Sequence, residues 1–268
     1  MEVSPEASPL IELKNLTAGY GSNTVLKDIS LAIEAGEFLG IIGPNGSGKS
    51  TLLHCISGIH ELESGDIRLT RKGYSEFTRK EMAKMIAVVE AEEAMTFQYS
   101  VGELVEMGRL PYLKRFETLK ENDRRAIELA LDTLQLTDLQ RRPINELSSG
   151  ERQRVFFARA LAQETKILLL DEPTAHLDLQ HQIDSFQLMH QLNRDCGQTI
   201  VCISHDINLA AEFCSRLIVL ENGRIKGDGP PETVLTNELI QDTFGQSFQL
   251  GTHPKSGRPY ILHPSRTE

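Results

Sequence analysis

The chain has 268 residues, 40% hydrophobic and 25% charged, with a formal net charge of −10. That composition is ordinary for a soluble globular protein with a sizeable core, and the acidic balance argues against a nucleic-acid partner. Because no stretch approaches the roughly 20 apolar residues that span a bilayer, and residues 1–9 lack the apolar core of a signal peptide, we expect a cytosolic protein that reaches a membrane only through a partner.

The first segments of the chain predict strands separated by turns. Residues 10–17 alternate apolar and polar side chains, as a half-buried strand does, and 25–33 continue as a second strand after a turn at 20–23. The run 38–42 is apolar without alternation, which is typical of a strand buried on both faces. A helix is predicted over 50–57.

A glycine-rich loop separates that buried strand from the helix. It fits the pattern G-x-x-x-x-G-K-[ST] at every required position, and the strand before it and the helix after it disfavour a chance glycine turn. Glycines let backbone N–H groups turn toward phosphate oxygens without a Cβ in the way. We expect Lys49 to reach the terminal phosphates and Ser50 to hold Mg²⁺. The predicted nucleotide-binding residues are Gly43, Pro44, Asn45, Gly46, Ser47, Gly48, Lys49, Ser50 and Thr51.

The middle of the chain has a different pattern. The periodicity of residues 78–140 is mainly helical apart from a short strand at 85–89, and Pro111 and Pro143 interrupt the pattern. We interpret this part as a helical subdomain inserted between two nucleotide-binding halves.

The second half alternates strands and helices. Buried strands are predicted at 167–170, 199–203 and 216–220, with helices over 150–162 and 179–194 between them. This alternation implies crossover connections and a mostly parallel sheet. Glycines and prolines from residue 223 to 231 indicate a turn-rich exit into a small C-terminal appendix.

Two of these strands end on side chains with catalytic potential. Asp171 and Glu172 follow the strand 167–170, at the carboxyl end where parallel sheets place their sites. We expect Asp171 to contact the Mg²⁺ shell and Glu172 to orient and deprotonate a water. An Asp-Glu pair alone is more often a solvated turn. Together with the phosphate loop, however, the pair favours the catalytic interpretation. His205 follows 199–203 and would contact the γ-phosphate, although a lone histidine there is usually structural.

The segment from Leu147 to Arg154 opens a helix. Ser148 is a good N-cap and Glu151 has capping-box spacing, so a purely structural interpretation of this segment is equally available. The segment lies about 20 residues before the Asp171-Glu172 pair, however, and the order of all these motifs resembles the ATP-binding subunit of an ABC transporter over nearly the whole chain.

That resemblance implies a shared site. Tyr20 would stack on adenine, and two copies would pack head to tail so that ATP lies between one phosphate loop and the signature of the other copy, formed by Ser148, Ser149 and Gly150. Asp178 would belong to the dimer-contact loop 175–178. The implied cofactors are ATP and Mg²⁺. The implied partners are the second copy, integral membrane permease subunits and, indirectly, a substrate-binding protein, with the chain peripheral on the cytoplasmic face of the inner membrane.

The expected fold is α/β, a P-loop NTPase core with a mostly parallel sheet, an N-terminal antiparallel β-subdomain and an inserted helical subdomain. We place the ATP-binding domain at 8–245, the helical insertion at roughly 92–162 and the appendix at 246–268.

The chain departs from the family pattern at two positions. The first signature glycine is Ser149, and the glutamine that links Mg²⁺ and the attacking water to the membrane contact falls at Ala91. Alanine has no oxygen for either ligand, and Gln98 lies seven residues too late for a direct substitute. We therefore predict intact ATP binding with weakened hydrolysis or coupling.

Three further segments narrow the subfamily. Residues 103–112, 174–181 and 257–261 resemble importers of ferric siderophores, haem and cobalamin. Siderophore import is favoured, haem and cobalamin come next, and zinc or manganese import ranks lower. From other classes, a soluble non-transport ABC ATPase and an ATP-binding regulator without turnover stay open, whereas P-loop kinases and GTPases lack the signature.

Overall fold

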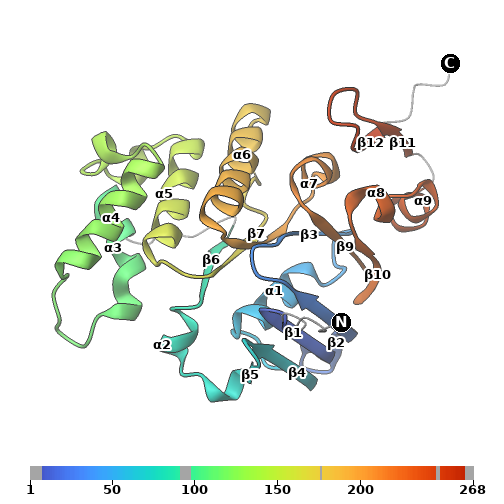
Figure 1. Cartoon of the computed structure of the whole chain (residues 1–268), viewed down its shortest axis with the longest axis horizontal. Coiled ribbons are helices and arrows are strands. Elements are labelled where there is room, and N and C mark those ends of the chain that lie inside the picture. Colours follow the sequence, from blue (N-terminus) through green and yellow to red (C-terminus); the bar gives the residue numbers. More distant parts are fainter. Residues whose placement is uncertain (1–7, 91–97, 176, 246–247, 263–268) are drawn as a thin grey trace, which may run out of the picture. The chain divides into compact units, whose positions relative to one another are not determined.

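The computed structural model describes residues 8–90, 98–175, 177–245 and 248–262, and the chain forms two compact units (Figure 1). The first unit joins Met1–Glu76 to Phe186–Glu268, and the second is Phe77–Ser185. Across the described residues, every helix is too short or too polar to cross a membrane.

The first unit contains an antiparallel sheet with strand order β2-β1-β4-β5. Ile11 pairs with Ile33 on one side and with Leu69 on the other, and all three side chains are buried. The sheet confirms the predicted N-terminal antiparallel β-subdomain, including the turn between its first two strands. Its later strands were not predicted. The bounds are β1 (Ile11–Tyr20), β2 (Asn23–Ile33), β4 (Ser64–Leu69) and β5 (Lys72–Gly73), followed by the 3-10 turn η1 (Tyr74–Glu76).

Four further strands of the first unit run in the order β10-β9-β3-β8. The middle strand β3 (Phe38–Ile42) is buried along its whole length and pairs in parallel with β8 (Thr199–Ile203) and β9 (Arg216–Glu221). Parallel pairing brings the carboxyl ends of these strands to one edge. The predicted α/β class, with a mostly parallel sheet, is confirmed.

The segment predicted as a turn-rich exit contains a strand, β10 (Arg224–Gly229), antiparallel to β9. Its register shifts between Ile225 and Gly227, so the glycine sits at an irregularity of an edge strand, where glycine is tolerated. Glycine-rich composition therefore concealed a strand. Beyond it lie α8 (Pro231–Val234), α9 (Asn237–Phe244) and a hairpin of β11 (Gln249–Thr252) and β12 (Pro259–Leu262).

The C-terminal hairpin packs on α7 (Ile207–Phe213). Arg258 Nη1 donates to the carbonyls of Ala211, at 2.7 Å, and Cys214, at 2.9 Å, and so satisfies acceptors that the end of α7 leaves open. This contact gives the segment 257–261 a structural role within the first unit.

The second unit pairs β6 (Ile86–Glu90) with β7 (Ile167–Asp171) in parallel. Among its helices, α3 (Val101–Glu106) and α4 (Glu121–Thr133) pack against α5 (Ser149–Ala162), as Figure 1 shows. The remaining elements of the unit are α2 (Arg79–Met82), η2 (Met107–Tyr112), η3 (Thr137–Leu139), η4 (Ile144–Glu146) and the start of α6 (Leu179–Cys196), which ends in the first unit.

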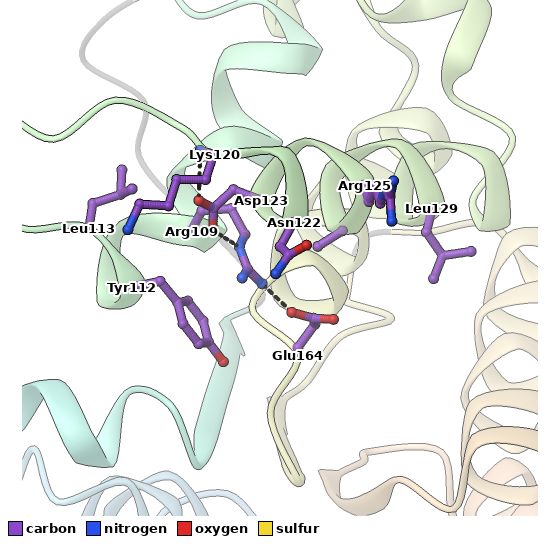
Figure 2. A pocket seen from close by; sticks show the side chains of 10 residues that line it. Arg109, Tyr112, Leu113, Lys120, Asn122, Asp123, Arg125, Leu129 and Glu164 are labelled. Atoms are coloured by element: carbon purple, nitrogen blue, oxygen red, sulfur yellow. Dashed lines mark hydrogen bonds and ion pairs between the residues drawn. The ribbon is translucent and has the colours of Figure 1, made fainter.

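A buried arginine holds the helices of the second unit together (Figure 2). The side chain of Arg109 is 4% exposed; its Nε donates to Asp123 Oδ1 at 3.0 Å and its Nη1 to Glu164 Oε2 and the Ala162 carbonyl, both at 2.6 Å. Burial raises the pKa of Asp123, but the Lys120 backbone N–H and the guanidinium outweigh it and hold that pKa below its usual range. The network fixes α4 and the end of α5 beneath a cavity of about 580 Å³.

Candidate functional site

The phosphate loop connects β3 to α1 (Lys49–Ser57) in the first unit. Gly43 has φ 154°, and a Cβ there would stand 2.1 Å from the Leu220 carbonyl oxygen at the end of β9, so no larger residue fits. Gly48 caps the helix in the left-handed conformation, with no side-chain hydrogen bond at the cap. The first turn of α1 therefore presents backbone N–H groups, which is the arrangement that binds anions at helix N-termini.

The side chain of Lys49 folds back on the start of this loop. Its side chain is almost fully buried, and Nζ donates to the carbonyls of Gly43, at 2.9 Å, and Pro44, at 3.1 Å. The ammonium group is therefore held across the start of the loop, where it can meet a phosphate oxygen as a charge-assisted donor.

The donor set fits a nucleotide phosphate and its cation. Ser47 Oγ is buried and has no hydrogen-bond partner within the described part of the chain, which suits an oxygen supplied by a ligand. Ser50 follows Lys49 in the first turn and is half-buried, and its hydroxyl is a hard oxygen ligand of the type that Mg²⁺ prefers.

His205 lies at the same edge of the sheet as the phosphate loop. Ile41 of β3 pairs with Ile203 of β8, so the loop and His205 both follow the carboxyl ends of adjacent parallel strands. Ser204 fastens this end, because its backbone N–H donates to the Ile41 carbonyl at 3.2 Å. His205 is exposed, and Asp206 caps α7 directly after it.

Tyr20 ends β1 and is 54% exposed. Its ring lies 4.5 Å from that of His60, whose Nε2 shares a hydrogen bond with the Gly19 carbonyl. Sequence reasoning missed His60, since nothing in the local pattern joins it to a tyrosine 40 residues earlier. The open ring face of Tyr20 is compatible with the predicted adenine contact, which stays a prediction.

The acidic pair ends β7 in the second unit. Asp171 is the last residue of the strand, and Glu172 has the left-handed φ of 51°, uncommon for a residue with a side chain. Asp171 lies in register with Glu90 of β6, a carboxylate that sequence reasoning did not single out. Ala91 comes next in the chain and lies outside the described residues, as does His176.

The signature segment opens α5 with the predicted capping box. Ser148 Oγ accepts from the Glu151 N–H at 3.2 Å, and the Ser148 N–H donates to Glu151 Oε2 at 2.8 Å. Hydrogen bonds from the Ser148 backbone and hydroxyl lower the pKa of Glu151. Ser148 and Ser149 are exposed, whereas Gly150 is buried.

Comparison with known proteins agrees with this geometry. The family model described as ABC transporter matches residues 26–175, more than half of the chain. The chain belongs to the ABC transporter family. The predicted resemblance is confirmed, and the chain is an ATP-binding ABC ATPase.

Two relatives and two solved structures illustrate the similarity. The iron(3+)-hydroxamate import ATP-binding protein FhuC of Bacillus subtilis is 37% identical and covers 94% of each chain. The hemin import ATP-binding protein HmuV of Rhodococcus jostii is 35% identical, over 96% of this chain and 87% of its own. A metal-chelate type ABC transporter in an inward-facing conformation matches with a TM-score of 0.82 at 29% identity, covering 96% of this chain and 98% of that one. The dimeric structure of a bacterial ABC transporter cassette matches with a TM-score of 0.69 at 32% identity, covering 82% and 98%.

Proposed function

We propose that this chain is the ATP-hydrolysing subunit of an importer that takes up a metal chelate, most simply a ferric siderophore. The observation that carries the proposal is the phosphate loop of an ABC ATPase, with Lys49 buried across it, in a chain whose relatives over most of its length are import subunits.

The residue roles follow from the chemistry of each group. The loop from Gly43 to Thr51 would bind the phosphates of ATP, and Tyr20 would stack on the adenine. Ser50 and Asp171 would hold Mg²⁺, which offsets phosphate charge when it is bound. Glu172 would orient and deprotonate the attacking water, and His205 would contact the γ-phosphate.

The proposed assembly is a head-to-tail pair of chains. The phosphate loop of one copy and the Ser148, Ser149 and Gly150 signature of the other would enclose one ATP, with Asp178 at the contact. Both signature serines face solvent in the single chain, which leaves their hydroxyls accessible to a second copy. ATP would close the pair and hydrolysis would open it, moving permease subunits at the cytoplasmic face of the inner membrane. A substrate-binding protein would deliver the cargo.

Reconstitution of the complete transporter tests this proposal. The chain would be purified with its permease subunits, and ATPase activity would be measured with a ferric siderophore, haem, cobalamin or no cargo. We expect ATPase activity that depends on Lys49 and Glu172 and is stimulated most by a ferric siderophore. Stimulation by haem or cobalamin, but not by a ferric siderophore, would change the proposed cargo to that compound. Failure to associate with a permease would reject the transport role.

The second candidate is import of haem, which the similarity to HmuV favours. A soluble ABC ATPase outside transport is the alternative from another class. Stable association with DNA or ribosomes, in place of a permease, would support it.

A further inference from the structure

A contact inside the second unit joins two of the segments proposed to meet the second copy. Gly150 is the buried member of the signature, and the imidazole of His181, in the first turn of α6, covers it. A Cβ at position 150 would lie 2.2 Å from His181 Cδ2 and 2.6 Å from Nε2. The Cδ2–Nε2 edge of the ring therefore occupies the space that a Cβ at position 150 would need.

The ring is held in that place by Asp178. Asp178 Oδ1 accepts from His181 Nδ1 at 2.8 Å and from the His181 backbone N–H at 2.9 Å. One carboxylate oxygen thus fixes both the start of the helix and the orientation of the imidazole. The His181 backbone N–H and then its ring lower the pKa of Asp178, so the carboxylate is charged at neutral pH.

The tautomer of the neutral ring follows from this hydrogen bond. A carboxylate only accepts, so Nδ1 must carry its proton, and in the neutral imidazole Nε2 is then the unprotonated nitrogen. The Cδ2–Nε2 edge is the one turned toward Gly150. Two contacts therefore connect Asp178 to Gly150 through His181. The exposed carboxylate orients the ring, and the ring packs on a backbone position that has no side chain of its own.

We propose that His181 is a positioning residue that couples Asp178 to the signature, so that Asp178 and Gly150 approach the second copy as parts of one rigid surface. The inference rests on the proposed function, in which Asp178 and Gly150 contact the second copy. It also gives Gly150 a role inside the chain. Position 150 is glycine because the imidazole occupies the space of a Cβ, in addition to any approach by nucleotide.

Substitution of His181 tests the coupling. His181→Ala removes the ring, His181→Asn keeps a donor that can reach Asp178 Oδ1, and Gln180→Ala alters an exposed neighbour whose amide bonds Asp184. ATPase kinetics and affinity for an ATP analogue would be measured for each variant. ATP-dependent dimerisation would be measured for each variant combined with Glu172→Gln, so that ATP is not consumed. We expect His181→Ala to lower kcat about tenfold, as a displacement remote from the chemistry can, and to weaken dimerisation. Affinity of the single chain for the analogue should stay unchanged, and His181→Asn should recover part of kcat.

Gly150→Ala supplies a second measurement. If the ring and a Cβ compete for one space, the double variant Gly150→Ala/His181→Ala should lose less activity than the two single losses multiplied together. Multiplicative losses, or a His181→Ala kcat within twofold of the wild type, would overturn the coupling.

Thermal unfolding separates a positioning role from a general one. An unchanged melting temperature with reduced kcat supports positioning, and a kcat loss that follows melting temperature across all variants contradicts it. A wild-type chain that neither binds the analogue nor dimerises would reject the proposed function itself. A wild type that does both, with His181→Ala equal to it, would reject only this inference.

Discussion

The phosphate loop and the signature segment are both glycine-containing turns that open a helix, but different forces hold them. The loop has no side-chain cap and depends on distant groups, such as the Leu220 carbonyl that excludes a Cβ at Gly43. The signature is held locally, by Ser148 and Glu151 three residues apart. The loop thus leads into an uncapped helix start with backbone N–H groups available to a ligand, whereas the signature leaves Ser148 and Ser149 facing solvent. The difference suits one segment to binding phosphate within the chain and the other to meeting a second copy.

Lys49→Ala should have the largest effect, and it should act on the loop alone. The substitution removes the buried ammonium group that donates to Gly43 and Pro44. We expect ATPase activity to fall about 100-fold, as it does when one preorganised donor to developing charge is lost. Lys72→Ala, at an exposed lysine of the same unit, is the matched control. Activity of Lys49→Ala within threefold of the wild type would contradict the role of this lysine.

Arg109→Met should destabilise the second unit, which contains the signature, and leave the phosphate loop unchanged. It leaves Asp123 buried without its guanidinium partner, and we expect the free energy of unfolding to fall by about 3 kcal/mol in denaturant titrations. Affinity of the folded chain for an ATP analogue should be unchanged. Arg125→Met, at a solvent-exposed ion pair with Glu121, should have no measurable effect. Equal losses in the two variants would show that burial of Arg109 is not what matters.

Ser148→Ala tests the local hold on the signature. Removing an N-cap hydroxyl costs about 1 kcal/mol of stability, because the Glu151 N–H loses its acceptor. Thermal unfolding should show this loss, and Ser149→Ala, at the adjacent exposed serine, should not. If the two serines behave alike in unfolding, the cap makes no contribution at this helix.

Acid should weaken the second unit through Asp123. Its folded pKa lies below the unfolded value of about 3.9, so its stabilisation is present above that value and is lost as pH falls through the folded pKa. The stability difference between the wild type and Asp123→Asn should therefore be constant near neutral pH and shrink in acid. Denaturant titrations across that range would measure it. A difference that grows as pH falls would give the pKa shift the opposite sign.

Ala91→Gln should have the smallest effect and raises activity. Glutamine supplies the oxygen that alanine lacks, and we expect cargo-stimulated ATPase activity to rise a few-fold, on the order of 1 kcal/mol or less in the barrier. Nucleotide affinity should not change, since the phosphate loop is untouched. Unchanged stimulated activity would contradict the prediction and would mean that this chain couples hydrolysis to transport without an oxygen ligand at position 91.

Local patterns predicted much of this protein. The run 38–42 is uniformly apolar and β3 has those bounds, and the Ser148 and Glu151 spacing predicted a capping box that the structure contains. The phosphate loop was predicted from its glycines and lysine. These features can be predicted from sequence because the residues that define their patterns lie within a few positions of one another along the chain.

Other features were decided only by tertiary structure. The burial of Arg109 depends on Glu164, 55 residues later, and the cover over Gly150 depends on His181, 31 residues later. The β10 strand forms because β9 supplies its pairing, despite three glycines in or next to it. Local sequence periodicity does not predict such contacts, because each joins residues that come together only after the chain has folded. The sequence alone therefore identified the chemistry of the phosphate loop, the capping box of the signature and the family, and the fold determined what buries Arg109 and what covers Gly150.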